Sequence, residues 1–243
     1  CIDTRVTAKS ILTRANCSPP HTPLRCKELT VYHWQKDDLA AMEKRYRANL
    51  INTVAGFKPA LLVGTADENG QSNLAIFSTI FHIGAAPPLI GMLVRPNPEG
   101  TQRHTLDNII ATGVYTLNHF PVSRAKDAHQ TSARYPHGQS EFSAAGFDID
   151  WHDEFAAPFV AGSRIQLGME LAEHQLLTVN NTHLVIGRVA SVHVAPELVR
   201  EDGTVNLAVA ESTVVAGLDS YHSVNPGQRF AYAKPTLPSK RID

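Results

Sequence analysis

Cysteine is scarce in this sequence and confined to one end of it. The three cysteines are Cys1, Cys17 and Cys26, so none lies beyond residue 26 of the 243. A fold held by a framework of disulfides is therefore not expected, and no thiol redox centre is expected in the globular body. Because nothing in the cysteine usage calls for an oxidising compartment, the cytoplasm is the predicted location.

Long apolar runs and an excess of charge of one sign are also missing. No apolar run approaches the roughly 20 residues that a membrane-spanning helix needs. Lys and Arg number 22 against 23 Asp and Glu, which gives a formal net charge of −1. We therefore predict no nucleic-acid partner and no membrane partner.

The short motifs that identify several enzyme classes do not occur. The sequence contains no Gly-x-Gly-x-x-Gly, no Gly-x-x-x-x-Gly-Lys-Ser/Thr, no His-Glu-x-x-His and no Gly-x-Ser-x-Gly. These absences argue against a Rossmann dinucleotide site, a P-loop, a zinc protease and a hydrolase nucleophile elbow. The 12 histidines include no pair at helical spacing beside a carboxylate, so no metal site is predicted.

What the sequence does contain is a series of hairpin signals. Residues 60–66 form an apolar run, Asp67-Glu-Asn-Gly70 has the composition of a turn, and residues 71–79 return as a second strand. Further strands are predicted at 89–94, 114–120, 165–179 and 184–194, and helices at 37–54, 105–111 and 121–133. Because hairpins outnumber strand–helix–strand units, the pattern favours a mainly β fold, an antiparallel barrel with flanking helices.

The periodicity also divides the chain. Residues 1–35 lack sustained periodicity in most of their length and include Ser18-Pro19-Pro20, so we predict a disordered or artefactual leader. Residues 36–200 are predicted to form the barrel domain. Residues 201–243 are predicted to be an extension that packs on the barrel or on a partner subunit, with Tyr221, Phe230 and Tyr232 as its aromatic contacts.

One group of residues has the chemistry of an anion site. Arg95, Arg103 and Thr105 lie shortly before or at the start of a predicted helix. A phosphate needs positive charge, hydroxyl donors and backbone N–H groups, and a helix N-terminus supplies the last of these. The same residues have an ordinary alternative interpretation, because a threonine there is commonly an N-cap and a loop arginine is commonly a solvated charge.

Several runs of sequence, in order, resemble the flavin reductase-like family of FMN-binding split barrels. The resemblance extends over about residues 45–195. The runs are residues 60–70, 73–81, 87–89, 105–118, 131–132, 135–136, 140–142, 145–146 and 183–189. No single run is diagnostic, and the order and spacing of the runs carry the comparison. The resemblance implies an antiparallel split β-barrel, commonly a homodimer with FMN near the subunit interface.

The resemblance also implies which residues contact the cofactor. Asn73, Ala75 and Ser78 match positions that line the flavin, and Arg95, Arg103 and Thr105 match the region that holds the ribityl phosphate. The full predicted cofactor-binding set is Asn73, Ala75, Ser78, Thr79, Arg95, Arg103, His104, Thr105, Ser132 and His183. His104 departs from the family pattern, where an acidic residue or lysine is frequent. His183 matches a position near the flavin, but its place beside a predicted turn also suits a surface histidine.

The functional hypothesis that follows is an FMN-dependent oxidoreductase. Electrons from NADH or NADPH would pass through FMN to an acceptor, and no catalytic side chain is assigned. The alternative is a non-catalytic FMN-binding or electron-carrier protein. A split barrel that binds haem or no cofactor, and a flavoenzyme that acts directly on an organic substrate, also fit the residues.

Overall fold

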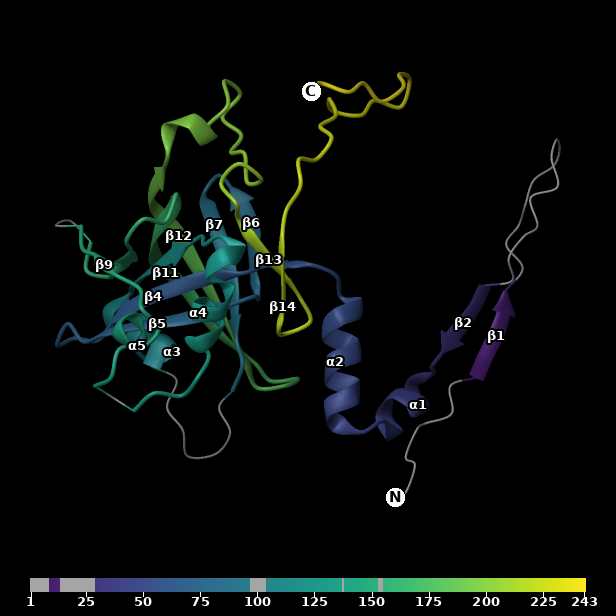
Figure 1. The fold of residues 1–243 in the computed structure, drawn as a ribbon, viewed down its shortest axis with the longest axis horizontal. Coiled ribbons are helices and arrows are strands. Elements are labelled where there is room, and N and C mark those ends of the chain that lie inside the picture. The colour runs from purple at the N-terminus through teal and green to yellow at the C-terminus, as the bar shows by residue number, and fades with distance from the viewer. Residues whose placement is uncertain (1–8, 14–28, 97–103, 137, 153–154) are drawn as a thin grey trace. The chain divides into compact units, whose positions relative to one another are not determined.

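The computed structural model describes residues 9–13, 29–96, 104–136, 138–152 and 155–243 (Figure 1). The chain forms two compact units, residues 1–55 and residues 56–243. No helix in the described part of the chain is long and apolar enough to cross a membrane. The three-part division into leader, barrel and extension stays a prediction.

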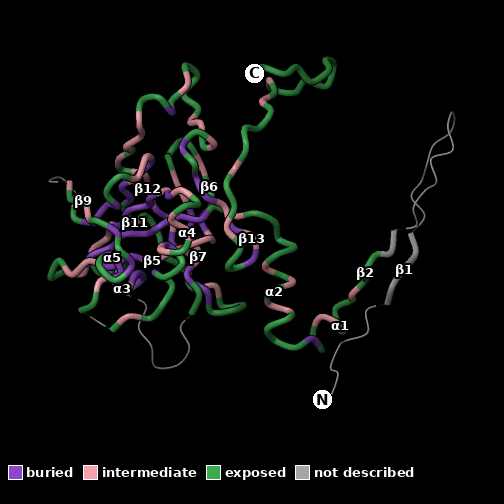
Figure 2. The backbone as a smooth tube through the Cα atoms, viewed as in Figure 1, coloured by how far each residue is buried: buried purple, intermediate pink, exposed green. Residues whose placement is uncertain are grey.

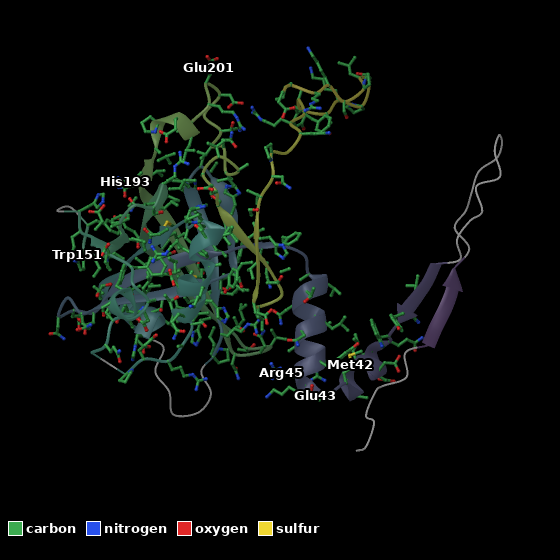
Figure 3. All side chains as sticks on the ribbon, in the orientation of Figure 1. Met42, Glu43, Arg45, Trp151, His193 and Glu201 are labelled. Carbon is green, nitrogen blue, oxygen red and sulfur yellow. The ribbon has the colours of Figure 1, made fainter. Side chains whose placement is uncertain are left out.

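The first unit contains a strand pair and two short helices. Strand β1 (Lys9–Thr13) pairs antiparallel with β2 (Leu29–His33), and helices α1 (Lys36–Ala41) and α2 (Lys44–Val54) follow. The single helix expected over residues 37–54 is therefore wrong. At Met42 the backbone turns extended, and the Glu43 carboxylate accepts hydrogen bonds from the N–H groups of Arg45 and Tyr46 at 2.9 and 2.8 Å (Figure 3). Glu43 thus caps a new helix.

The second unit is built on a seven-stranded antiparallel sheet. Its strand order is β5-β4-β8-β11-β12-β7-β6. This confirms the mainly β, antiparallel fold. Residues 80–85 form a further strand. The strands are β4 (Leu61–Ala66), β5 (Ser72–Phe77), β6 (Ile80–Ala85), β7 (Pro88–Val94), β8 (Val114–Asn118), β11 (Ile165–Leu177) and β12 (Thr182–Val194).

Short strands and helices cover this sheet. Strand β9 (Ile149–Asp150) pairs with β10 (Phe159–Val160), and β13 (Thr213–Ala216) lies between β3 (Lys58–Pro59) and β14 (Ser220–Ser223). The helix expected over residues 121–133 begins later and as a 3-10 turn, because Pro121 is extended and bridges to Ser212. The helices are α3 (His104–Thr112), η1 (Val122–Arg124), α4 (Ala125–Gln130), α5 (Glu141–Ala144) and η2 (Pro196–Leu198).

Strand β4 separates two apolar clusters, and all six of its residues are buried (Figure 2). Leu61 and Val63 pack with Leu106 and Ile109 of α3. The alternate residue Leu62 belongs to the other cluster, which includes residues of α4 and α5. Successive strand side chains point to opposite faces, so a strand covered on both sides reads as the continuous apolar run seen in the sequence.

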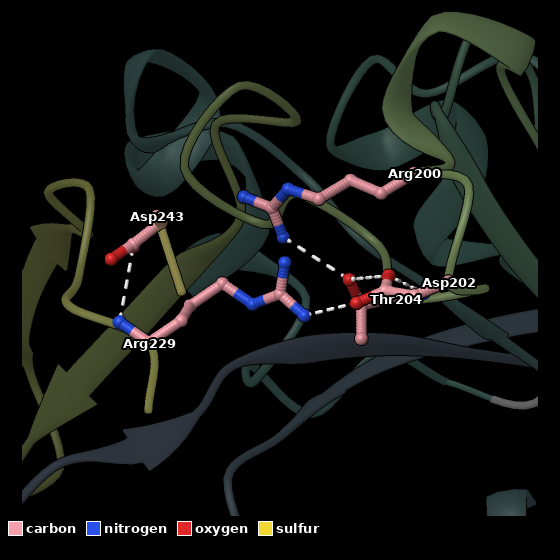
Figure 4. A network of polar contacts seen from close by, with 5 residues as sticks. All are labelled: Arg200, Asp202, Thr204, Arg229 and Asp243. Atoms are coloured by element: carbon pink, nitrogen blue, oxygen red, sulfur yellow. Dashed lines mark hydrogen bonds and ion pairs between the residues drawn. The ribbon is translucent and has the colours of Figure 1, made fainter. Parts of the chain in front are cut away.

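A polar network joins two parts of the C-terminal region (Figure 4). The Arg229 guanidinium contacts Asp202, and the Asp202 carboxylate also accepts from the Thr204 hydroxyl at 2.7 Å. The hydroxyl oxygen of Thr204 accepts a hydrogen bond from the Arg200 guanidinium at 3.4 Å. The Asp243 carboxylate accepts one from the backbone N–H of Arg229 at 3.0 Å. The hydrogen bonds that Asp202 accepts from the Thr204 hydroxyl and the Arg229 guanidinium hold the pKa of its carboxyl well below its usual range. The pairs are solvent-exposed, so each contributes little stability.

His119, directly after β8, gives the barrel a pH-dependent stability. Its Nδ1 lies 2.8 Å from the Ser212 hydroxyl, and burial lowers its pKa to about 4 from the ordinary 6.5. Between these values the unfolded chain binds the proton and the folded chain does not, so His119 costs stability as pH falls from 6.5 toward 4.

Between pH 7 and pH 4.5, we expect the free energy of unfolding of the wild type to fall by about 2 kcal/mol more than that of His119→Gln. Urea unfolding at both pH values measures this, and equal losses would contradict it.

Candidate functional site

Four buried polar side chains connect the first turns of α3 with strands β4 and β5. Nδ2 of Asn73 donates to the hydroxyls of Thr65 and Thr105, each at 3.1 Å. Nδ2 of Asn108 donates to Thr65 Oγ1, also at 3.1 Å. None of the four residues is more than 8% exposed. Buried polar groups are costly unless hydrogen-bonded, so this α3 network fixes the helix start against the hairpin.

Local sequence explains why these side chains meet. The hairpin register sets Thr65 opposite Asn73, and the turn between them is closed by the Asp67 carboxylate, which accepts from the N–H groups of Asn69 and Gln71, both at 2.9 Å. On α3, Thr105 and Asn108 are three residues apart and so share a helix face. Sequence reasoning missed Thr65 and Asn108, although the hairpin register and the helix spacing both pointed to them.

A small pocket opens beside the α3 network. Glu141 at the start of α5 lines it, and its carboxylate accepts from the N–H of Leu74 at 3.1 Å. Burial raises the pKa of Glu141, whereas the Leu74 N–H and the nearby His104 act in the opposite direction. Sequence reasoning did not select Glu141. The pocket is lined by Asp67, Gln71, Ser72, Asn73, His104, Asn108, Gly138, Gln139 and Glu141.

A second group of predicted residues lies at the end of β7. Arg95 follows Val94 directly, and the β7–β12 register sets His183 opposite Val94. The Thr79 hydroxyl donates to the carbonyl of Leu93 at 2.6 Å, which ties the start of β6 to the same place. Burial lowers the pKa of Lys58, and the positive charge of Arg95 lowers it further. Two cations therefore lie within electrostatic reach of each other here.

His183, on β12, contacts His174 of the paired strand β11. Its Nδ1 lies 2.8 Å from Nε2 of His174, and the two rings stack at 5.1 Å between centroids. Burial lowers the pKa of His183, His174 lowers it further, and Asp107 of α3 raises it. Asp107 of α3 therefore lies within electrostatic reach of His183.

Comparison with known proteins assigns this barrel to a family. Residues 56–212, more than half of the chain, match the family described as flavin reductase like domain. The chain belongs to the flavin reductase-like family.

Solved structures agree with that assignment. A split-barrel protein of the flavin reductase type from Shewanella frigidimarina is 43% identical, with a TM-score of 0.80, and the match covers 84% of this chain and all of the other. Nitrilotriacetate monooxygenase component B from Bacillus cereus is 20% identical, with a TM-score of 0.70 over 88% and 98% of the two chains. An FMN-binding protein from Thermus thermophilus is 18% identical, with a TM-score of 0.59 over 70% and 88%. The last two show the shared fold alone.

The flavin reductase-like fold brings most of the predicted site residues into two groups. Asn73, His104 and Thr105 lie at the α3 network or its pocket, and Ala75 lies two residues beyond Asn73 on the same face of β5. Ser78 is in the bend after β5, and Thr79, Arg95 and His183 lie around the end of β7. The cofactor-binding roles of these residues stay predictions.

Two predicted residues remain, of which only Ser132 is among the described residues. Arg103 lies outside the described residues. The Ser132 hydroxyl donates to the carbonyl of His129 at 2.7 Å, at the end of α4. Among the described residues, no hydrogen bond of Ser132 reaches α3 or β5. Its predicted role therefore has no support from these contacts.

Proposed function

We propose that this protein is an FMN-dependent oxidoreductase that passes electrons from NADH or NADPH through FMN to an acceptor. The observation that supports this most strongly is the α3 network, which holds a helix N-terminus and a threonine hydroxyl in fixed positions on a flavin reductase-like barrel. When bound, FMN would supply the hydride-accepting and electron-donating chemistry, and the protein would bind and orient it.

The donor set at the α3 network fits a phosphate. The first N–H groups of a helix have no partner within the helix, and the helix dipole adds attraction for an anion. Thr105 Oγ1 accepts from Asn73, so its own proton remains to be donated. Arg95 adds the positive charge. We assign the phosphate to Thr105, Arg95 and the α3 N-terminus, and the flavin ring to the side of Asn73, Ala75 and Ser78.

The nicotinamide is assigned to the side of His183. Because its pKa is lowered, its imidazole is neutral near pH 7 and can donate or accept a hydrogen bond without a net charge.

A homodimer is proposed as well, because the family resemblance implies flavin near a subunit interface. Light scattering at several protein concentrations measures the oligomeric state.

The direct test of the proposed function is an absorbance spectrum with a reduced-nicotinamide titration. The purified protein with added FMN is expected to retain the flavin through gel filtration and to bleach rapidly on adding NADH or NADPH under argon. If dithionite bleaches the flavin but NADH and NADPH do not, the protein is an FMN-binding electron carrier and the proposed enzyme activity is refuted. Protein that does not retain FMN would refute the cofactor assignment itself.

Substitution of Arg95 tests the phosphate position. Arg95→Gln is expected to weaken FMN binding at least tenfold and riboflavin binding far less, because only FMN carries the phosphate that the guanidinium would pair with. Flavin fluorescence titration gives both dissociation constants. Arg188→Gln, at an exposed arginine of β12, is the matched control for loss of one charge. If Arg95→Gln weakens the binding of FMN and of riboflavin equally, the phosphate does not bind at Arg95.

A further inference from the structure

A second open groove lies over strands β11 and β12 and shares no residue with the α3 network or with the group at the end of β7. It measures about 1210 Å³, including the part open to solvent, which leaves room for a small organic molecule. Trp151 and His193 lie on this side of the barrel (Figure 3). The groove is lined by Asp150, Trp151, His152, Phe155, Glu170, Ala190, Ser191 and His193.

The backbone of the two strands is shaped to form this groove. Gly168 pairs with Ser191 and Met169 with Val189, so a β-bulge leaves Ala190 without a partner. A Cβ on Gly168 would lie 2.4 Å from the Ser191 hydroxyl oxygen and 3.2 Å from the Phe155 ring. The glycine therefore lets both side chains approach the strand. Bulges of this kind redirect side chains and are frequent beside binding sites.

Aromatic rings form the floor of the groove. The His152 ring lies 4.5 Å from the rings of both Phe159 and His193, and Phe159 is fully buried. Phe155 contacts Phe159 at 5.6 Å. In contrast, Trp151 is 47% exposed. The exposed indole of Trp151 offers a flat apolar surface to a ligand.

The charges that line the groove are negative. Asp150 holds His152 through a contact of 3.2 Å between its carboxylate and Nε2, and Glu170 is an exposed carboxylate on β11. The nearest cation by strand register is Arg188, which is paired directly across from Glu170 but is not among the residues that line the groove.

We propose that this groove is a binding site for a small organic cation with an aromatic or methylated body. A cation over an indole face is attracted by the ring's electron density, and recognition of quaternary ammonium groups commonly uses this interaction. Asp150 and Glu170 supply the complementary charge, and the aromatic rings of Trp151 and Phe155 accept the body of the ligand. This site is independent of the flavin site, so either can fail without the other.

Trp151 itself provides the test. The chain has two tryptophans, Trp34 and Trp151, so Trp34→Phe leaves one reporter in the full-length, FMN-supplemented protein. Benzyltrimethylammonium is expected to change the Trp151 emission in a saturable way, whereas benzyl alcohol and benzoate are expected to bind at least fivefold more weakly. Equal binding of the three probes, or no saturable change with the cation, would overturn the proposal.

Carboxylate variants separate local recognition from overall charge. Glu170→Gln in the Trp34→Phe background is expected to weaken binding of the cation about fivefold. Glu201→Gln removes one negative charge from an exposed carboxylate outside the groove and is expected to leave binding unchanged. Both substitutions are at exposed positions, so both variants are expected to keep the melting temperature of the parent. An equal effect of the two would show that net charge alone attracts the cation and would overturn the assigned site.

Discussion

Replacing Asn73 by leucine is expected to weaken FMN binding at least tenfold and to destabilise the fold as well. Leucine keeps the approximate volume but removes both hydrogen bonds that the Asn73 amide donates, to Thr65 and to Thr105. The loss should also destabilise the fold by about 2 kcal/mol, because two buried hydroxyls lose a partner. Flavin fluorescence titration and urea unfolding measure the two effects separately.

Thr105→Val provides the matched comparison, because it cuts the same Asn73–Thr105 hydrogen bond from the other side. If that bond positions the helix start for FMN, the loss of FMN affinity in the double variant should be smaller than the sum of the two single losses. Fully additive effects would show that the two residues act independently. A folded Asn73→Leu protein with unchanged FMN affinity would remove Asn73 from the site.

The substitution Gly64→Ala is expected to have the largest effect on stability, a loss of about 3 kcal/mol. A Cβ at position 64 would lie 2.2 Å from the carbonyl oxygen of Pro158 and 2.6 Å from the Thr116 hydroxyl oxygen. Thr116 also donates to that carbonyl at 2.7 Å, so the segment that carries Pro158 is held close to the sheet. Because the obstacle is backbone in the middle of β4, the strand or the Pro158 segment must move.

Gly84→Ala is the matched control for this change. A Cβ at position 84 would meet only the Pro87 carbonyl oxygen, at 3.5 Å, which is an ordinary contact. We expect its free energy of unfolding to stay within about 1 kcal/mol of wild type. Chemical denaturation of both variants checks the pair, and equal stabilities for Gly64→Ala and Gly84→Ala would contradict the close approach at Gly64.

Much of the barrel follows from local sequence. The apolar run at residues 60–66, the Asp67–Gly70 turn and the return strand predict the β4–β5 hairpin, because turn composition and side-chain alternation are set within a few residues. The same reasoning finds α3, β7 and the long β11–β12 hairpin. It fails at Met42, because apolar spacing alone does not show that Glu43 caps a second helix.

The candidate site likewise has a part that the sequence predicts and a part that only the tertiary structure decides. The sequence by itself determined that the chain forms an antiparallel barrel, and its resemblance to the flavin reductase-like family selected Asn73, Arg95 and Thr105 as candidate residues. Only the tertiary structure decided that Asn73 donates to Thr105, which lies 32 positions further along the chain, and that Thr65 and Asn108 complete the network. It also decided that Gly168 and a bulge open a groove over β11 and β12. Contacts of this kind depend on how separate elements pack, and the local periodicity of a chain does not contain that information.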